Sequence, residues 1–268
     1  MNNKLLLPTG KAHISYSELK NWKECSHRHH LQYIQGIDLS EENEFLIFGT
    51  AIHNACEEFI ETKQISIESH VEALKSEWEK FQFDDAEKWA KTAKSILEEV
   101  PDFINETFPN WEGVKAEEKI FESVKNQNIS FKGFIDAVIK APNKKGKTIY
   151  HLLDWKTANW GWKRQKKQDF MMKAQLIYYK NFWSQKHNIP LKDIRCGFVL
   201  LKRSAKKGGR CELVPISVGE KTSERAFKII DNMVYSLRSG ASLKNRMNCG
   251  YCQFKDTKFC PSWLQETS

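Results

Sequence analysis

The sequence contains no run of the roughly 18 consecutive apolar residues that a membrane-spanning helix requires. Before Pro8 it offers only three leucines, too short a run for the apolar region of a secretory signal peptide. It also lacks the G-x-x-x-x-G-K-[ST] loop with which many ATPases bind nucleotide phosphates. We therefore expect a cytoplasmic protein, of a prokaryote or a virus-infected host cell, that makes no contact with membrane and does not itself use ATP.

Cysteine is present, but in a number and arrangement that do not suit a disulfide framework. The chain of 268 residues has 7 Cys, an odd number at uneven spacing. Cys56, Cys196 and Cys211 stand alone in apolar or strand-like segments, so we expect them to be small core residues.

The other four cysteines form a pattern typical of a metal site. Cys249 and Cys252 make a C-x-x-C pair, Cys260 follows, and Cys25 lies far upstream. Four thiolates suit either a structural zinc ion or an iron–sulfur cluster, and their spacing alone does not separate the two. Either group would tie the C-terminal segment to the first helix. Close to Cys25, His27, His29 and His30 could offer alternative zinc ligands, but we expect them instead to form, with Arg28, a polar or phosphate-facing helix surface.

The charge balance is basic, with 42 Lys and Arg against 34 Asp and Glu and a formal net charge of +8. A basic protein suits a polyanionic partner, although many soluble proteins are basic. Two basic runs, residues 163–167 (KRQKK) and 202–210 (KRSAKKGGR), fall between expected structured segments. There they could meet phosphate groups.

Periodicity predicts helices first, then strands, then a mixture of both. The Ser15-x-x-Glu18 pattern is a capping box, and it predicts the start of the first helix. Pro101 should kink or end the fourth helix. The expected helices are 16–34, 47–62, 67–81, 84–105, 169–185 and 221–237. The expected strands are 114–124, 129–141, 148–157, 194–203 and 210–218, the first three consecutive and antiparallel.

This order indicates an α+β fold rather than a doubly wound sheet. We expect one domain over residues 1–268, with an N-terminal helical region (14–112), an α/β core (113–218), and a C-terminal helix and Cys-rich tail (219–268).

Three residues of the expected sheet could carry chemistry. Asp154 and Lys156 lie two apart on one strand, so their side chains leave the same face. Asp136 lies on the preceding, antiparallel strand. Two converging carboxylates suit Mg²⁺ or Mn²⁺, which can activate water and polarise a phosphoryl oxygen. A neighbouring lysine can stabilise the charge that develops on phosphorus, so these residues could together hydrolyse a phosphodiester.

The spacing alone is weak support, because an acid followed two places later by Lys occurs five times in the chain. The acids that begin these matches are Glu18, Glu61, Glu117, Asp154 and Asp256. Asp154 differs by its context, since it ends an apolar strand and follows Gly133-Phe-Ile-Asp136 on the strand before. Charged residues are disfavoured in such a strand, and local exceptions of this kind often mark a site.

Several further motifs occur in the order found in one family. They are Cys25 in the first helix, Gly49-Thr-Ala-Ile-His53, Glu118 (or Glu117), Gly133-Phe-Ile-Asp136, Asp154-Trp-Lys156-Thr157 and Gln175-Leu-Ile-Tyr-Tyr179. With these motifs the chain resembles the RecB-like branch of the PD-(D/E)XK nuclease superfamily, from about residue 14 to residue 260. The resemblance implies a restriction-endonuclease-like core, a mixed central sheet flanked by helices.

The resemblance also implies a role for each matching residue. Asp136 and Asp154 would bind Mg²⁺ or Mn²⁺, with His53 as a further ligand. Lys156 would act at the attacking water and the scissile phosphate. Catalytic support would come from Glu118, Gln175 and Tyr179, the last two of which could instead be ordinary helix packing.

For the cysteines, the resemblance favours a 4Fe-4S cluster over zinc. Its iron–sulfur subgroup, which includes AddB-type and CRISPR-associated RecB-like exonucleases, uses one N-terminal Cys and a C-terminal trio. The match here is Cys25, Cys249, Cys252 and Cys260. The seven residues between Cys252 and Cys260 exceed the usual gap of that subgroup.

Aromatic and basic residues follow the strand that carries Asp154. Rings can stack on exposed bases and cations can follow a phosphate backbone, so this segment suits single-stranded DNA. The alternative is a solvated loop whose Trp side chains pack inward. The residues concerned are Trp160, Trp162, Lys163, Arg164, Lys166 and Lys167.

Together these features predict a metal-dependent DNA exonuclease that acts on DNA ends or single strands in recombination, repair or phage DNA processing. A helicase or recombination partner would have to supply any unwinding. The alternatives are a non-catalytic nucleic-acid-binding scaffold with a degenerate nuclease fold, and a nuclease that acts on RNA.

Overall fold

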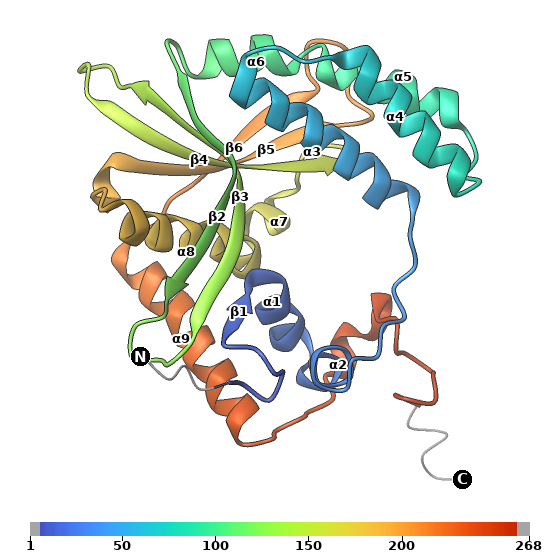
Figure 1. Cartoon of the computed structure of the whole chain (residues 1–268), viewed down its shortest axis with the longest axis vertical. Coiled ribbons are helices and arrows are strands. Elements are labelled where there is room, and N and C mark those ends of the chain that lie inside the picture. Colours follow the sequence, from blue (N-terminus) through green and yellow to red (C-terminus); the bar gives the residue numbers. More distant parts are fainter. Residues whose placement is uncertain (1–5, 262–268) are drawn as a thin grey trace. The chain divides into compact units, whose positions relative to one another are not determined.

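The computed structural model describes residues 6–261, which form two compact units (Figure 1). Of the described residues, the first unit combines 6–41, 121–133 and 220–261, and the second combines 42–120 and 134–219. Strands β2 (Glu112–Ser123) and β3 (Ser130–Pro142) each contribute residues to both units. Within residues 6–261, no helix is both long and apolar enough to span a membrane.

The second unit contains the mixed sheet. Besides β2 and β3, its strands are β4 (Thr148–Ala158), β5 (Ile194–Lys202) and β6 (Cys211–Ile216). Strand β4 is antiparallel to β3 and parallel to β5, and β6 is antiparallel to β5. Its helices are α3 (Glu44–Thr62), α4 (Ile67–Lys80), α5 (Ala86–Leu97), α6 (Val100–Thr107), α7 (Arg164–Gln168), α8 (Phe170–His187) and the 3-10 turn η2 (Leu191–Asp193). The expected α+β class with a mixed central sheet is confirmed.

The alternation of side chains along β4 builds two different faces. Leu153 and Trp155 are buried against the apolar sides of α3 to α6, in one continuous core. Tyr150, on the opposite face, packs its ring against Trp183 of α8, at 5.1 Å between ring centroids. Figure 1 shows α3 to α6 on one side of the sheet and α8 on the other. Asp154 and Lys156 therefore belong to the face that α8 covers.

The first unit gathers both ends of the described chain. Strand β1 (His13–Ser15) pairs in parallel with the first residues of β3. The Ser15 side chain accepts the backbone N–H of Glu18 at 3.2 Å, as the capping box predicts. The helical elements are α1 (Tyr16–Glu24), α2 (Ser26–His29), the π-helix η1 (His30–Ile34), α9 (Glu220–Arg238) and the 3-10 segment η3 (Arg246–Tyr251). The Trp22 indole N–H donates to Ser236 Oγ at 3.2 Å, which ties α1 to α9.

Two expected helices are each divided. The expected helix 16–34 breaks at Cys25, whose backbone is extended (φ −163°, ψ 109°) and whose Sγ accepts the N–H of Arg28 at the start of α2. The expected helix 84–105 splits into α5 and α6, and Pro101 lies in the first turn of α6. Proline needs no N–H partner in a first turn, so it begins a helix here and does not end one.

Candidate active site

Asp136 and Asp154 lie where two paired strands separate. The ladder between β3 and β4 ends at Ala137 and Leu153, one residue before each carboxylate is reached. Beyond it, the backbone N–H of Trp155 donates to Asp136 Oδ2 at 2.8 Å. A side-chain carboxylate thus replaces a strand carbonyl as the acceptor, and this contact fixes its position at the edge of the opening.

Helix α8 holds the second carboxylate. Gln175 donates from Nε2 to Asp154 Oδ1 at 2.6 Å, and Tyr179 Oη lies 3.3 Å from the same nitrogen. Gln175 and Tyr179 are one helical turn apart and so share a face. The Asp154 side chain is only 1% exposed. This carboxylate is therefore oriented by protein contacts rather than by water.

Lys156 forms an ion pair with the second carboxylate. Its Nζ lies 2.5 Å from Asp154 Oδ2 and 5.8 Å from the centroid of the Phe198 ring. Burial alone would lower the pKa of Lys156, but the charges of Asp154 and Asp136 outweigh burial and raise it. The ammonium stays charged at neutral pH.

His53 approaches from α3. Its Nδ1 lies 3.5 Å from Asp136 Oδ2. Burial is the main cause that lowers the pKa of His53, with the Lys156 charge adding to it and Asp154 opposing it. A neutral imidazole has a free lone pair, which is the form that binds metals.

The donor set fits a hard divalent cation. Burial, and next the charge of Asp154, raise the pKa of Asp136 well above its ordinary value, so two such carboxylates need a cation to be ionised together. Asp154 Oδ2 is buried without an aligned hydrogen bond, and its partner in the described chain is the Lys156 ammonium. The two carboxylates match the preference of Mg²⁺ and Mn²⁺ for oxygen ligands, and the imidazole favours a transition metal such as Mn²⁺. Within residues 6–261, however, no group of three or more His, Cys, Asp or Glu is arranged to hold a metal ion as it stands.

Glu118, expected in the site, contacts the end of α8. Its Oε1 lies 2.6 Å from Lys186 Nζ and 2.9 Å from His187 Nε2. Burial opposes ionisation of Glu118, but these two partners prevail and lower its pKa. Glu117 has a positive φ of 46° inside β2, a bulge-like irregularity. The pKa of Glu57 on α3 is raised, first by burial and next by the charge of Glu117. The two neighbouring glutamates thus lie in different surroundings.

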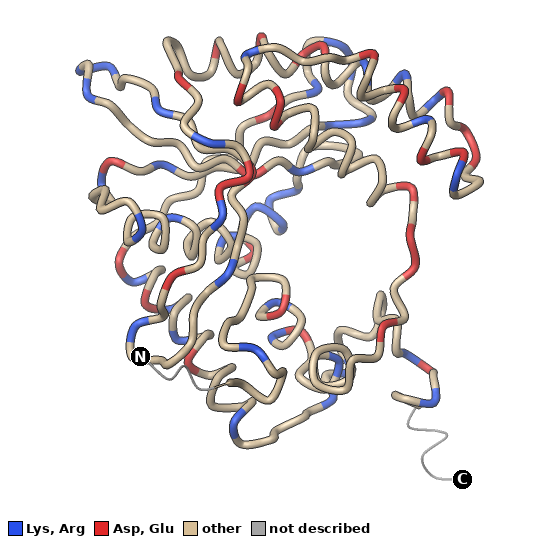
Figure 2. The backbone as a smooth tube through the Cα atoms, viewed as in Figure 1, with Lys and Arg blue, Asp and Glu red and all other residues tan. Residues whose placement is uncertain are grey.

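The expected DNA-binding segment has both exposed and packed members. Trp160 is 61% exposed, whereas Trp162 is 8% exposed and packs on Phe198 at 5.1 Å between centroids. The buried ring of Trp162 is not available for stacking on a base. Lys166 lies over that ring, and Lys167 pairs with Glu212 at 2.7 Å. Figure 2 shows Lys and Arg gathered along α7, where Lys163, Arg164 and Lys166 are exposed.

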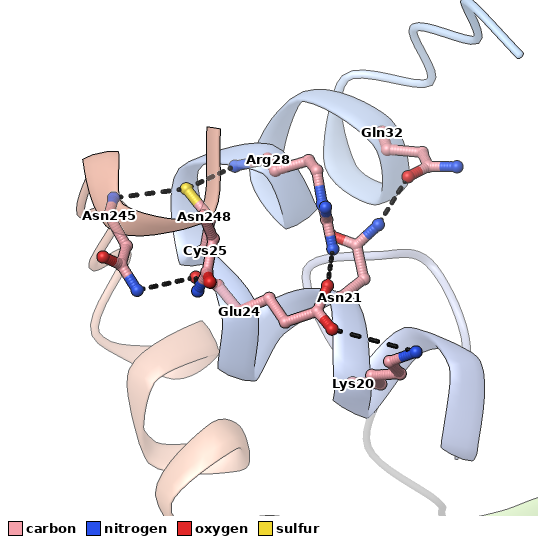
Figure 3. Close-up of polar contacts among 8 residues, drawn as sticks. All are labelled: Lys20, Asn21, Glu24, Cys25, Arg28, Gln32, Asn245 and Asn248. Atoms are coloured by element: carbon pink, nitrogen blue, oxygen red, sulfur yellow. Dashed lines mark hydrogen bonds and ion pairs between the residues drawn. The ribbon is translucent and has the colours of Figure 1, made fainter. Parts of the chain in front are cut away.

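The first unit brings the four predicted cysteines around one narrow cavity. Its lining includes Cys25, Cys249, Cys252 and Cys260. Burial raises the pKa of Cys260; the charge of Lys244 opposes this shift, and the other three cysteines add to it. Cys25 Sγ accepts the backbone N–H groups of Arg28 (3.5 Å) and Asn245 (3.4 Å), as Figure 3 shows.

Asparagine side chains fix the chain around these thiols. Asn245 and Asn248 both donate from Nδ2 to the carbonyl of Glu24, at 2.9 and 2.7 Å (Figure 3). His29, an alternative zinc ligand, is buried and contacts Glu18 Oε1 at 3.1 Å. Its Nε2 is therefore already engaged by a carboxylate.

Comparisons with known proteins place this site in context. The family model of the PD-(D/E)XK nuclease superfamily matches residues 13–261. A solved structure from Eubacterium rectale, described as a "putative exonuclease", matches with a TM-score of 0.58 and 12% identity, over 96% of this chain and 93% of that one. A solved structure named SSO0001 has a TM-score of 0.34 and 15% identity, over 89% and 92% of the two chains. The comparison with curated proteins gave no match.

Proposed function

Because the chain belongs to the PD-(D/E)XK nuclease superfamily, we propose that it is a divalent-metal-dependent DNA nuclease whose chemistry takes place at Asp136, Asp154 and Lys156. The observation that carries this proposal is the meeting of a buried carboxylate, a partly buried carboxylate and a charged lysine where β3 and β4 separate. The exonuclease description of one structural neighbour agrees with it, although at 12% identity that neighbour shares the fold alone.

Asp136, Asp154 and His53 are the residues that would hold Mg²⁺ or Mn²⁺. A bound divalent ion supplies an acidified water and polarises a phosphoryl oxygen. The pKa of Lys156 is raised, so its ammonium remains charged and can stabilise the negative charge that grows on the scissile phosphate. Gln175 and Tyr179 are positioning residues, since they act through Asp154. For the acidic residue of β2 the proposal favours Glu117, because Glu118 is engaged by Lys186 and His187.

We further propose that single-stranded DNA or a DNA end enters along Trp160 and α7. An exposed indole can stack on a base, and Lys163, Arg164 and Lys166 can follow the phosphates. A separate helicase or recombination protein would supply unwound strands.

Replacing Trp160 with Ala should weaken single-strand binding by about 1–3 kcal/mol, the usual contribution of one stacked base. Fluorescence anisotropy with a labelled oligonucleotide in EDTA measures binding without cleavage. Tyr235→Ala is the matched control, since Tyr235 is 77% exposed on α9 in the other unit. Equal losses in both variants would argue against this entry path.

The nuclease proposal is tested by digestion of labelled linear single-stranded DNA, linear duplex DNA, circular single-stranded DNA and RNA, with Mg²⁺, Mn²⁺ or EDTA. We expect metal-dependent loss of linear DNA from its ends and survival of the circle. Cleavage of the circle would identify an endonuclease. Cleavage of RNA alone would show that the substrate is RNA and not DNA. Salt-sensitive binding to DNA with every substrate intact would indicate a non-catalytic scaffold.

For Cys25, Cys249, Cys252 and Cys260 we propose a 4Fe-4S cluster, with structural zinc as the alternative. Their meeting around one cavity and the N–H groups directed at Cys25 Sγ support a shared metal group. Anaerobic purification should give a brown protein with iron and sulfide, and Cys249→Ser should lose both. Cys211→Ser, outside the quartet, should keep them. A colourless protein with stoichiometric zinc would rule out the cluster.

A further inference from the structure

A second cavity, of ≈ 540 Å³, lies in the second unit between β5, β6 and α8. Lys180 of α8, His151 of β4 and Arg195 of β5 line it, together with apolar side chains. Lys180 is only 7% exposed, whereas Arg195 is exposed. The cavity therefore has one cation in its depth and another at its opening.

The cavity has cationic side chains but no acidic one. None of its lining residues is Asp or Glu. Arg195 donates to the backbone carbonyls of Lys192 and Ile194, at 3.0 and 3.4 Å, and so keeps its charge free of a carboxylate. Within residues 6–261, the Lys180 ammonium forms neither an ion pair nor a hydrogen bond. Its Nζ is not fully buried, so an unpaired positive charge lines the cavity, and such a charge favours an anion at this place.

Lys180 and His151, two other titratable groups of the cavity, both have lowered pKa values. Burial is the main cause that lowers the pKa of Lys180. Burial, helped by the charge of Arg195, lowers the pKa of His151 to about 4. Both shifts follow mainly from burial, and the charge of Arg195 adds to each of them.

The walls of the cavity are apolar and the space is larger than a simple anion needs. Phe108, Leu213 and Pro215 line it, and the Phe108 ring lies 4.7 Å from the ring of His151. Its volume falls in the range of about 300–1,000 Å³ typical of small-molecule sites. The lining therefore suits a ligand that joins an apolar part to an anionic part.

We propose that this cavity binds a mononucleotide, with its phosphate on Lys180 and Arg195 and its base against Phe108, Leu213 and Pro215. Lysine binds phosphate as a point charge, and arginine offers a planar pair of donors. The inference does not rest on the proposed nuclease function, because it concerns binding at residues other than Asp136, Asp154 and Lys156.

Isothermal titration of the full-length chain tests this, with EDTA present to exclude metal-bound ligand at the candidate active site. The probes are deoxyadenosine monophosphate, deoxyadenosine and inorganic phosphate, each applied separately. Lys180→Met removes the buried charge at nearly constant length, and Arg195→Gln removes the outer one. Lys192→Met is the matched control, because Lys192 is an exposed lysine close to Arg195 that does not line the cavity.

We expect the monophosphate to bind and to raise the melting temperature, as a ligand of the folded state does. Affinity should fall roughly tenfold or more in Lys180→Met and in Arg195→Gln, as for a lost charged hydrogen bond, and should be unchanged in Lys192→Met. Lys180→Met should also melt at a higher temperature than wild type without ligand, which shows that it folds.

Four results would overturn the proposal. They are no binding of the monophosphate, undiminished binding by Lys180→Met, equal affinity for deoxyadenosine, and equal affinity for inorganic phosphate. Equal affinity for deoxyadenosine would show that the cations do not contribute to binding. Equal affinity for inorganic phosphate would show that the apolar walls do not contribute.

Discussion

At the scale of single residues, an amide of α8 helps to orient Asp154. Gln175 Nε2 lies 2.6 Å from Asp154 Oδ1, in a place from which water is excluded. Groups that orient a metal ligand typically change metal affinity or activity by about 10–100-fold when they are removed.

Gln175→Ala should therefore lower cleavage by about 10–100-fold and raise the Mg²⁺ concentration needed for half-maximal activity. The measurement is a metal titration of the digestion rate. Gln64→Ala, an exposed glutamine beyond the end of α3, is the control and should leave the titration unchanged. A lower rate at unchanged metal requirement would mean that Gln175 does not act through the metal ligand.

His151 should make the protein less stable in acid. Its pKa in the folded chain is about 4, below the ordinary 6.5, because of burial and the charge of Arg195. The unfolded chain binds the proton below about pH 6.5 and the folded chain only below about pH 4, so acidification between these values favours unfolding.

The full pKa shift of His151 corresponds to about 3 kcal/mol in the free energy of unfolding. Because the side chain is only half-buried, we expect a loss of about 1–2 kcal/mol on acidification. His151→Gln should lose this part of the pH dependence of the free energy of unfolding, measured with urea from pH 7 to pH 4. Parallel pH profiles for the variant and wild type would contradict the assignment.

At the scale of elements, the close contact between β2 and α3 requires a glycine at position 113. A Cβ on Gly113 would come within 2.2 Å of the backbone carbonyl oxygen of Ile60. Backbone cannot move aside as a flexible side chain can, so the two elements would have to separate.

Gly113→Ala should therefore destabilise the protein by about 1–3 kcal/mol in chemical denaturation. Gly209→Ala is the matched control, because its Cβ would have an ordinary contact of 3.5 Å with Lys206 O. Similar stabilities for the two variants would contradict the close approach of β2 to α3.

Much of the arrangement around Asp136, Asp154 and Lys156 could be predicted from the sequence, because side-chain alternation and hairpin order dictate which strand residues share a face. The strands carrying them were found with nearly correct bounds. Less regular features could not be predicted. Which of Glu117 and Glu118 faces α8 depends on local strand geometry that includes one positive φ, and the break at Cys25 depends on contacts with distant Asn245.

The burial of Trp162 could not be predicted from the sequence either. A Trp near basic residues can stack on a base or pack on the sheet, and here the partner is Phe198, distant in the sequence. Strand β1 has three residues and α7 has five, too few for a hydrophobic period to be recognised.

At the scale of the whole molecule, each unit holds one expected centre. The second unit carries Asp136, Asp154 and Lys156, and the first carries the four cysteines. A single domain over residues 1–268 remains a prediction. The C-terminal segment of the first unit is connected to α1 and α2 by hydrogen bonds to Glu24, Cys25 and Ser26, which is where a cluster or zinc ion would add its own links.

The central claim is that the carboxylates and lysine at the separation of β3 and β4 perform metal-dependent cleavage. The most direct measurement is digestion of end-labelled DNA in Mg²⁺ by wild type, Asp154→Asn and Lys156→Ala, with binding measured in parallel. Glu61→Gln is the control, since Glu61 and Lys63 repeat the same spacing at the exposed end of α3. We predict that both site variants bind DNA but lose about 100-fold or more in cleavage rate, while Glu61→Gln cleaves as wild type. Cleavage by Asp154→Asn and Lys156→Ala at the wild-type rate would contradict the account.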